Sequence, residues 1–121
     1  KVSALFSESE RITMINQSIS HLKNVEVDSF NGLLVNYAVE NNSNAIIRGL
    51  RALSDFEFEF KMALMNRSLK EEISTVFMMP HEKYTHISSS LVKEVASLGG
   101  DVSVYVPQHV ERALQESFSD K

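Results

Sequence analysis

The sequence of 121 residues contains no cysteine, which excludes a disulfide framework, a thiolate metal site and a cysteine nucleophile. It has no apolar run near the ~18 residues that a membrane-spanning helix needs. Basic residues are in the minority, 12 against 16 acidic ones, which argues against a general nucleic-acid binder. We therefore expect no nucleic-acid or membrane partner, and a reducing cytoplasm suits the chain.

The sequence does contain enough apolar material for one folded domain. Hydrophobic residues make up 43% of the chain and charged residues 23%, a balance that favours a core over disorder. The length suits a single domain over residues 1–121, and no repeat, linker or low-complexity segment divides it.

Helix and strand signals alternate along the chain. A capping box at Ser7-Glu8-Ser9-Glu10 begins a helix of roughly 13 residues. Further helices are predicted at 33–40, at 55–67 with Ser54 as N-cap, from Ser88 to the glycines at 99–100, and from Pro107 in a first turn. Strands are predicted at 25–28, 45–47 and 75–79.

The strands at 45–47 and 75–79 are continuous apolar runs, typical of strands buried on both faces. Their alternation with helices predicts an α/β fold, a doubly wound parallel sheet covered on both sides. Three strands make a thin sheet for such a fold. We therefore expect an N-terminal βα unit to be absent from this chain, which would then be about three-quarters of the domain.

Two clusters are candidates for binding phosphate. Arg48-Gly49-Leu50-Arg51 follows the strand at 45–47, and ligands of open α/β sheets bind at the carboxyl ends of strands. Two guanidiniums around a glycine suit a phosphate, whereas the alternative is a pair of solvated surface arginines. Ser88, Ser89 and Ser90 open a helix whose unpaired amides suit an anion, although an ordinary serine N-cap is equally possible. Both clusters are expected to face one crevice.

The helix at 55–67 is apolar almost all round, which indicates burial on more than one side. A second subunit is the expected partner, and a central place within the monomer is the alternative. Glu59 stands out there, either as a ligand for a ribose hydroxyl or as the ion-pair partner of Arg51. Glu57 and Lys61 are predicted to form a surface pair. The apolar side chains are those of Phe56, Phe58, Phe60, Met62, Ala63, Leu64 and Met65.

The four histidines do not indicate a metal site. His81 and His86 have poor ligand spacing and no carboxylate cluster beside them, and His21 and His109 are expected at solvated helix positions. A Ser-His-Asp spacing and Gly-rich Walker or dinucleotide motifs are also not legible. We expect no protein-bound metal.

Two long stretches closely resemble the signature of the bacterial phosphopantetheine adenylyltransferase family. They are RGLRALSDFEFE at 48–59 with MALMN at 62–66, and ISSSLVKE at 87–94. Shorter matches are Phe6-Ser7, Glu10-Arg11, Gly32-Leu33-Leu34 and Gly100-Asp101-Val102. The resemblance runs the whole length without a gap.

The resemblance implies a Rossmann-like nucleotidyltransferase that joins the AMP part of ATP to 4′-phosphopantetheine, giving dephospho-coenzyme A and pyrophosphate. It further implies Mg²⁺ carried on the nucleotide, a cytoplasmic enzyme of coenzyme A biosynthesis, a homohexamer, and dephospho-coenzyme A or coenzyme A as a ligand. The protein would position two anions and stabilise the developing charge.

Residue roles also follow from the resemblance. Arg48 is expected to bind the phosphate of phosphopantetheine, and Leu34 is expected to form part of the pantetheine pocket. Gly49, Leu50, Arg51 and Glu59 are expected to bind ATP, with Arg51 and Ser89 as the catalytic residues. The remaining ATP contacts are expected from the loop formed by Tyr84, Thr85, His86, Ile87, Ser88, Ser89 and Ser90.

The sequence departs from the family pattern in three places. His86 stands where the family usually has an aromatic residue, and the family's N-terminal Thr/Gly/His motif has no match. A family lysine falls at Val2, one place from Lys1. The alternative is therefore a truncated, non-catalytic fragment that binds nucleotide or coenzyme A. A receiver-like domain would need an acidic cluster at the strand ends, and Asp28 alone does not supply one.

Overall fold

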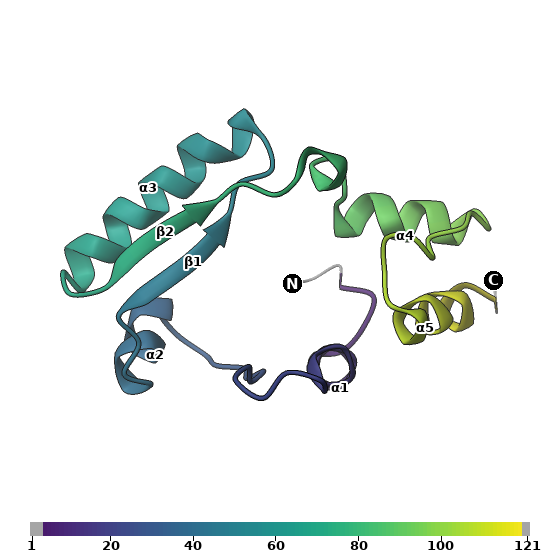
Figure 1. The fold of residues 1–121 in the computed structure, drawn as a ribbon, viewed down its shortest axis with the longest axis horizontal. Helices are drawn as coiled ribbons and strands as arrows, with labels where there is room; N and C mark the ends of the chain where they lie inside the picture. The colour runs from purple at the N-terminus through teal and green to yellow at the C-terminus, as the bar shows by residue number, and fades with distance from the viewer. Residues whose placement is uncertain (1–3, 120–121) are drawn as a thin grey trace. The chain divides into compact units, whose positions relative to one another are not determined.

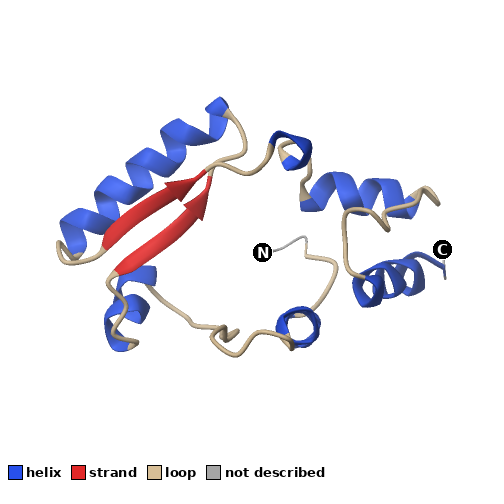
Figure 2. Cartoon of the chain, in the orientation of Figure 1, coloured by secondary structure: helices blue, strands red, loops and turns tan. Residues whose placement is uncertain are grey.

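The computed structural model describes residues 4–119, which form two compact units (Figure 1). One unit spans residues 30–86 and contains a small parallel sheet with helices. The other combines the residues before 30 with those from 87 onward and is helical (Figure 2). No helix within residues 4–119 has both the length and the apolar character that crossing a membrane requires.

In the sheet unit, a helix connects two parallel strands. The elements run in the order α2 (Leu34–Glu40), β1 (Ala45–Gly49), α3 (Leu53–Leu69) and β2 (Ser74–Met78). The strands pair in parallel along their whole length. Two consecutive parallel strands need a crossover connection such as α3, because a tight turn can join only antiparallel strands. The predicted α/β class with a parallel sheet is therefore confirmed.

The helix α3 begins earlier than the sequence predicts. Its N-cap is Ala52, whose backbone is extended at φ −146° and ψ 158°, and no side chain caps it. The predicted N-cap role of Ser54 is therefore wrong, since Ser54 already lies inside the helix. The helix gains stability from packing on the sheet instead. The rings of Phe56 and Phe77 pack edge to face, with their centroids 6.4 Å apart.

The core of the sheet unit lies on one face of the strands. Val35 and Ala38 of α2 pack with Ile46 of β1 and with Ile73, and all four side chains are buried. The opposite face is open: Ile47 and Met78 are 67% and 58% exposed. The prediction that both strands are buried on both faces is wrong for this unit, because α2 and α3 pack on the same side.

Residues 25–28 do not form the predicted strand. The chain from Leu22 to Leu33 has no regular secondary structure, and within residues 4–119 no strand pairs with it. An alternating apolar pattern becomes a strand only when another backbone satisfies its amides and carbonyls. The predicted strand at 25–28 is therefore not part of the sheet, which contains β1 and β2.

The helical unit contains α1 (Glu8–Ile19), α4 (Ser89–Ser97) and α5 (Gln108–Ser119). The predicted capping box is confirmed, because the Ser7 Oγ accepts a bond from the Glu10 amide and Glu10 accepts one from the Ser7 amide. These bonds lower the pKa of Glu10. The predicted end of α4 is also confirmed, with Gly99 in the left-handed conformation at φ 82°.

His109 connects two helices of this unit and is not the solvated residue that the sequence predicts. Its Nε2 lies 2.9 Å from the carbonyl oxygen of Met14 and 3.2 Å from the Oγ of Ser18, which joins α5 to α1. A carbonyl oxygen only accepts, so Nε2 carries the proton. His21 is exposed, as predicted, but lies in the turn after α1.

Candidate functional site

The two arginines lie at the carboxyl edge of the sheet. Arg48 and Gly49 are the last two residues of β1, which runs two residues further than predicted. The Leu50 amide donates to the Met78 carbonyl at 3.0 Å, so pairing with β2 continues past the end of the strand. Arg51 then precedes α3. This edge is where open α/β sheets bind their ligands.

Gly49 leaves space at this edge. A Cβ at this position would lie 4.0 Å from the nearest neighbouring atom, the Met78 carbonyl oxygen, and Gly49 has no positive φ. Packing within the unit therefore does not require a glycine here. The absence of a side chain instead leaves the backbone between the two arginines accessible to a ligand.

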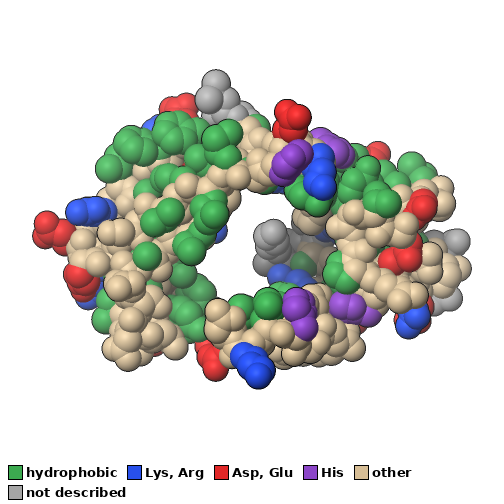
Figure 3. Space-filling model, in the orientation of Figure 1, with side chains coloured by type: hydrophobic (Ala, Val, Ile, Leu, Met, Phe, Trp, Pro, Cys, Tyr) green, Lys and Arg blue, Asp and Glu red, His purple; other side chains and the backbone are tan. Residues whose placement is uncertain are grey.

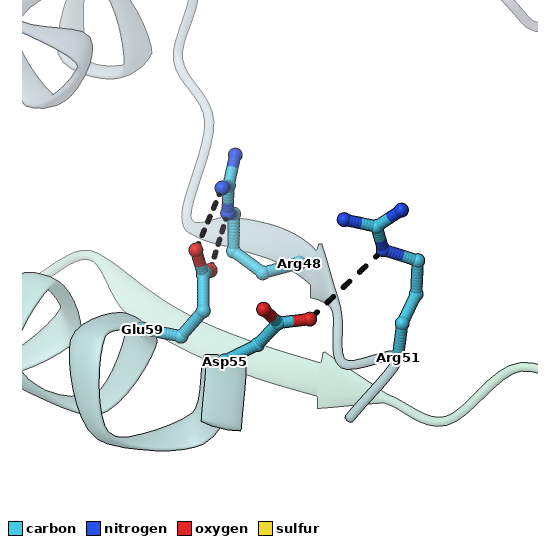
Figure 4. A network of polar contacts seen from close by, with 4 residues as sticks. All are labelled: Arg48, Arg51, Asp55 and Glu59. Carbon is cyan, nitrogen blue, oxygen red and sulfur yellow. Dashed lines mark hydrogen bonds and ion pairs between the residues drawn. The ribbon is translucent and has the colours of Figure 1, made fainter. Parts of the chain in front are cut away.

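Arg48 and Glu59 form a bidentate ion pair (Figure 4). The Nε of Arg48 donates to one carboxylate oxygen at 2.7 Å, and Nη2 donates to the other at 2.9 Å. β1 supplies the arginine and α3 the carboxylate, eleven residues apart. Two parallel charge-assisted bonds fix the plane of the guanidinium as well as its position.

The environment keeps both members of this pair ionised. The hydrogen bonds from Arg48 lower the pKa of Glu59, and those to Glu59 raise the pKa of Arg48. The Glu59 side chain is only 15% exposed, whereas the Arg48 side chain is 52% exposed. The carboxylate thus supports the arginine from the helix side, and the guanidinium remains accessible to solvent.

Arg51 is paired with Asp55 and not with Glu59. Its Nε lies 3.9 Å from a carboxylate oxygen of Asp55, and the two side chains are 49% and 39% exposed. The predicted ion pair between Glu59 and Arg51 is therefore wrong, because the bidentate pair with Arg48 takes Glu59. Sequence reasoning missed Asp55, although its i,i+4 spacing from Arg51 signals a contact.

The loop that begins at Tyr84 has its own local order. The short 3₁₀ helix η1 (Glu82–Tyr84) ends at Thr85, whose hydroxyl donates to the Glu82 carbonyl at 2.8 Å. Lys83 places its Nζ 4.9 Å from the centre of the Tyr84 ring. His86 is exposed.

The serines that follow include an ordinary N-cap and two exposed residues. The Ser88 Oγ accepts a bond from the Leu91 amide at 3.1 Å, so the N-cap interpretation is confirmed for Ser88. Ser89 and Ser90 are the first residues of α4 and are exposed. The amides of a first helical turn lack partners within the helix, and the dipole is positive there. The anion-binding role of Ser88, Ser89 and Ser90 stays a prediction, as does the crevice shared with the arginines.

Comparison with known proteins gives the family. A model described as cytidylyltransferase-like matches residues 1–95. Phosphopantetheine adenylyltransferase from Heliobacterium modesticaldum is 53% identical over 116 residues, covering 96% of this chain and 69% of the relative. Those from Opitutus terrae and Desulfosudis oleivorans are also 53% identical, over 97% and 95% of this chain and 73% and 68% of the relatives.

This chain belongs to the phosphopantetheine adenylyltransferase family. The resemblance seen in the sequence motifs is thereby confirmed, as is the nucleotidyltransferase fold class. Five residues that the family resemblance singles out lie together around the end of β1: Arg48, Gly49, Leu50, Arg51 and Glu59. Leu34, by contrast, begins α2 and packs against the core cluster. The binding roles of all six residues stay predictions.

The α3 helix of this adenylyltransferase-family chain exposes a large apolar surface. Phe58, Leu64 and Met65 are 57%, 56% and 59% exposed, and Phe60 and Met62 are nearly half exposed. Figure 3 shows hydrophobic side chains gathered over this helix. The predicted surface pair is confirmed on the same helix, with Lys61 Nζ 3.2 Å from a Glu57 oxygen. The described unit leaves these side chains exposed, and the second subunit expected to cover α3 stays a prediction.

The four histidines lie apart from any recognisable metal site. Within residues 4–119, no group of three or more histidine and acidic residues is placed to hold a metal ion. The His81 Nδ1 is occupied, because it accepts a bond from the Lys83 amide at 3.2 Å.

Proposed function

We propose that this protein transfers the AMP part of ATP to the 4′-phosphate of phosphopantetheine, giving dephospho-coenzyme A and pyrophosphate. The observation that carries the proposal is 53% identity, over nearly the whole chain, to proteins named phosphopantetheine adenylyltransferase. The two arginines at the carboxyl edge of the sheet support it, because the reaction brings two anions together.

The chemistry requires positioning more than covalent participation by the protein. An oxygen of the 4′-phosphate attacks the α-phosphorus of ATP in line, and a new P–O bond forms. The bond from the α-phosphorus to the bridging oxygen breaks, and pyrophosphate leaves with that electron pair. Fixed cations lower the barrier by offsetting the repulsion between the phosphates and the charge that develops on the leaving group.

The proposed roles follow the geometry around β1. Arg48 binds the phosphate of phosphopantetheine, and Leu34 lines the pantetheine pocket. Arg51 binds the phosphates of ATP, with Gly49 and Leu50 beside the nucleotide. The loop at 84–90 binds adenine and phosphate, and Ser89 acts with Arg51 on the reacting phosphates. The exposed first turn of α4 supports the last role.

Mg²⁺ is proposed to enter with ATP. Its charge, when bound, would partly neutralise the phosphate oxygens. Of the acidic residues at the arginine edge, Glu59 is already bound to Arg48 and Asp55 lies 3.9 Å from Arg51, so a cation at either carboxylate would compete with a nearby arginine. The ion is therefore assigned to the nucleotide and not to a protein site.

We further propose a cytoplasmic homohexamer that also binds dephospho-coenzyme A or coenzyme A. The exposed apolar side chains of α3 support assembly, because monomers rarely leave so many large apolar groups of one helix in water. Sedimentation of the complete protein tests this. A single species at the monomer mass would contradict the assembly.

The activity is tested with the complete protein, ATP, Mg²⁺ and phosphopantetheine. Pyrophosphate release and the mass of dephospho-coenzyme A are both measured, with Glu57→Gln as a control for changes on α3. Product formation that requires both substrates is the expected result. Binding of both substrates without product would favour the non-catalytic alternative, and binding of neither would refute the proposed function.

A further inference from the structure

We propose that Glu59 is a positioning residue for Arg48. It grips one edge of the guanidinium so that the other edge faces the phosphate of phosphopantetheine. The inference rests on the proposed function only for the identity of that phosphate. The arrangement itself comes from the contacts between β1 and α3.

The first step is the way in which the donors of Arg48 are divided. A guanidinium has five N–H donors in a planar fork. Glu59 takes the donor on Nε and one donor on Nη2, which together form the side edge of the group. Both Nη1 donors and the second Nη2 donor remain, and within residues 4–119 the structure shows no further hydrogen bond from them. One Nη1 donor and the second Nη2 donor form the end edge, which suits a phosphate oxygen pair.

The second step is the difference in exposure across the pair. The Glu59 side chain is 15% exposed and lies on α3, a helix of 17 residues packed on β2. The Arg48 side chain is 52% exposed. In Figure 4 the Arg48 nitrogen that makes no contact with Glu59 points away from α3. A ligand can therefore reach Arg48 while Glu59 stays in place behind it.

The third step is the gain for binding. An arginine on a flexible stem loses rotamer freedom when it closes on a ligand, and this loss weakens affinity. Arg48 has already lost much of that freedom to Glu59, so less is lost when phosphate binds. Because the Glu59 carboxylate is ionised and bonded to Arg48, it also holds the positively charged guanidinium at the carboxyl edge of the sheet.

Positioning of Arg48 is compatible with a nucleotide contact at Glu59, because each carboxylate oxygen can accept a second hydrogen bond beside those of 2.7 and 2.9 Å. Removal of Glu59 should weaken phosphopantetheine binding through the loss of Arg48 positioning, whatever its effect on ATP binding.

The test measures two affinities separately in the complete protein. Calorimetry of Glu59→Ala is expected to show phosphopantetheine binding weakened by about tenfold, or about 1.4 kcal/mol, and ATP binding is measured beside it. Glu59→Gln keeps the size of the side chain and one acceptor, and is expected to fall between Glu59→Ala and the unchanged protein. Glu57→Gln, on the same helix, is the matched control, and melting temperatures check that each variant is folded.

A double-mutant cycle makes the test specific to positioning. In an Arg48→Ala background, Glu59→Ala should cause no further loss of phosphopantetheine affinity, since there is no arginine left to position. Equal losses in both backgrounds would overturn the proposal. An unchanged protein that binds neither substrate would refute the proposed function instead, so the two failures are distinguishable.

Discussion

The two arginines at the end of β1 are held in different ways. Arg48 is a strand residue, and Glu59 grips it through two bonds of 2.7 and 2.9 Å. Arg51 lies in the following turn, and the nearest oxygen of Asp55 is 3.9 Å away, too far for a hydrogen bond. Asp55 and Glu59 lie one turn apart on α3, so one face of the helix supplies both carboxylates.

The difference between the pairs shows how position in the chain sets rigidity. Arg48 and Glu59 are eleven residues apart and come from packed elements, so their contact fixes the relation of β1 to α3. Arg51 and Asp55 are close in sequence and both more than a third exposed, so solvent screens their attraction. We infer that Arg48 offers a preset site for a phosphate, whereas Arg51 can adjust to a nucleotide whose charge shifts during reaction.

The largest effect is expected from removing the looser arginine. Arg51→Ala should lower kcat for pyrophosphate release by about 10²- to 10³-fold, the usual loss when a group that stabilises transition-state charge is removed. Its melting temperature should change little, because the pair with Asp55 is long and exposed. Steady-state kinetics and thermal unfolding check both parts. If the variant merely unfolds, Arg51 is structural and the phosphate role is wrong.

A smaller effect is expected from Arg48→Lys, which distinguishes the role of the planar guanidinium from the role of its charge. Arg48→Lys keeps the charge but cannot bond to Glu59 and to a phosphate through two planar edges. We expect phosphopantetheine affinity to fall by about tenfold, the equivalent of about 1.4 kcal/mol. Arg51→Lys should reduce ATP affinity less, since the Nε of Arg51 lies 3.9 Å from Asp55 and this pair does not fix the guanidinium plane as Glu59 fixes that of Arg48. Equal losses from the two lysine variants would contradict the comparison.

The sequence predicted the elements better than it predicted their burial. The capping box at Ser7, the helix around Phe58 and the two paired strands all follow from local signals. The exposure of Ile47 could not be predicted, because periodicity shows that a strand is apolar and not which of its faces is covered. The strand expected at 25–28 failed for a related reason, since a strand depends on a partner far away in the chain.

The candidate site was predicted in its composition and not in its pairing. Both arginines and Glu59 were identified from the sequence, yet the ion pair considered for Glu59 was one with Arg51 and not with Arg48. Spacing along the chain can reveal a contact between near neighbours, such as that between Arg51 just before α3 and Asp55 in its first turn. It cannot reveal a contact between a strand and a helix, because that depends on how α3 packs across the sheet.

A pH series tests the tighter pair through stability. Arg48 lowers the pKa of Glu59 below 4.5, so folding is stabilised by the ionised form above the unfolded pKa. This contribution is lost as the pH falls through the folded pKa. Glu59→Gln should therefore melt a few degrees below the unchanged protein at pH 7, and the gap should narrow below about pH 4.5. Glu57→Gln is the control and should change the melting temperature less. A gap that is constant from pH 7 to pH 3 would show that packing, not charge, is responsible.

The smallest effect is expected at the looser pair. Asp55→Asn should change the free energy of unfolding by about 0.5 kcal/mol or less, since exposed ion pairs contribute little and salt screens them. Asp55 also lies in the first turn of α3, where a carboxylate favours the positive end of the helix, so the sign should be destabilising. Urea unfolding at low and high salt measures this, with Glu59→Gln beside it. A cost at Asp55 as large as that at Glu59 would mean that α3 holds both arginines equally, and the proposed division between a preset and an adjustable arginine would be wrong.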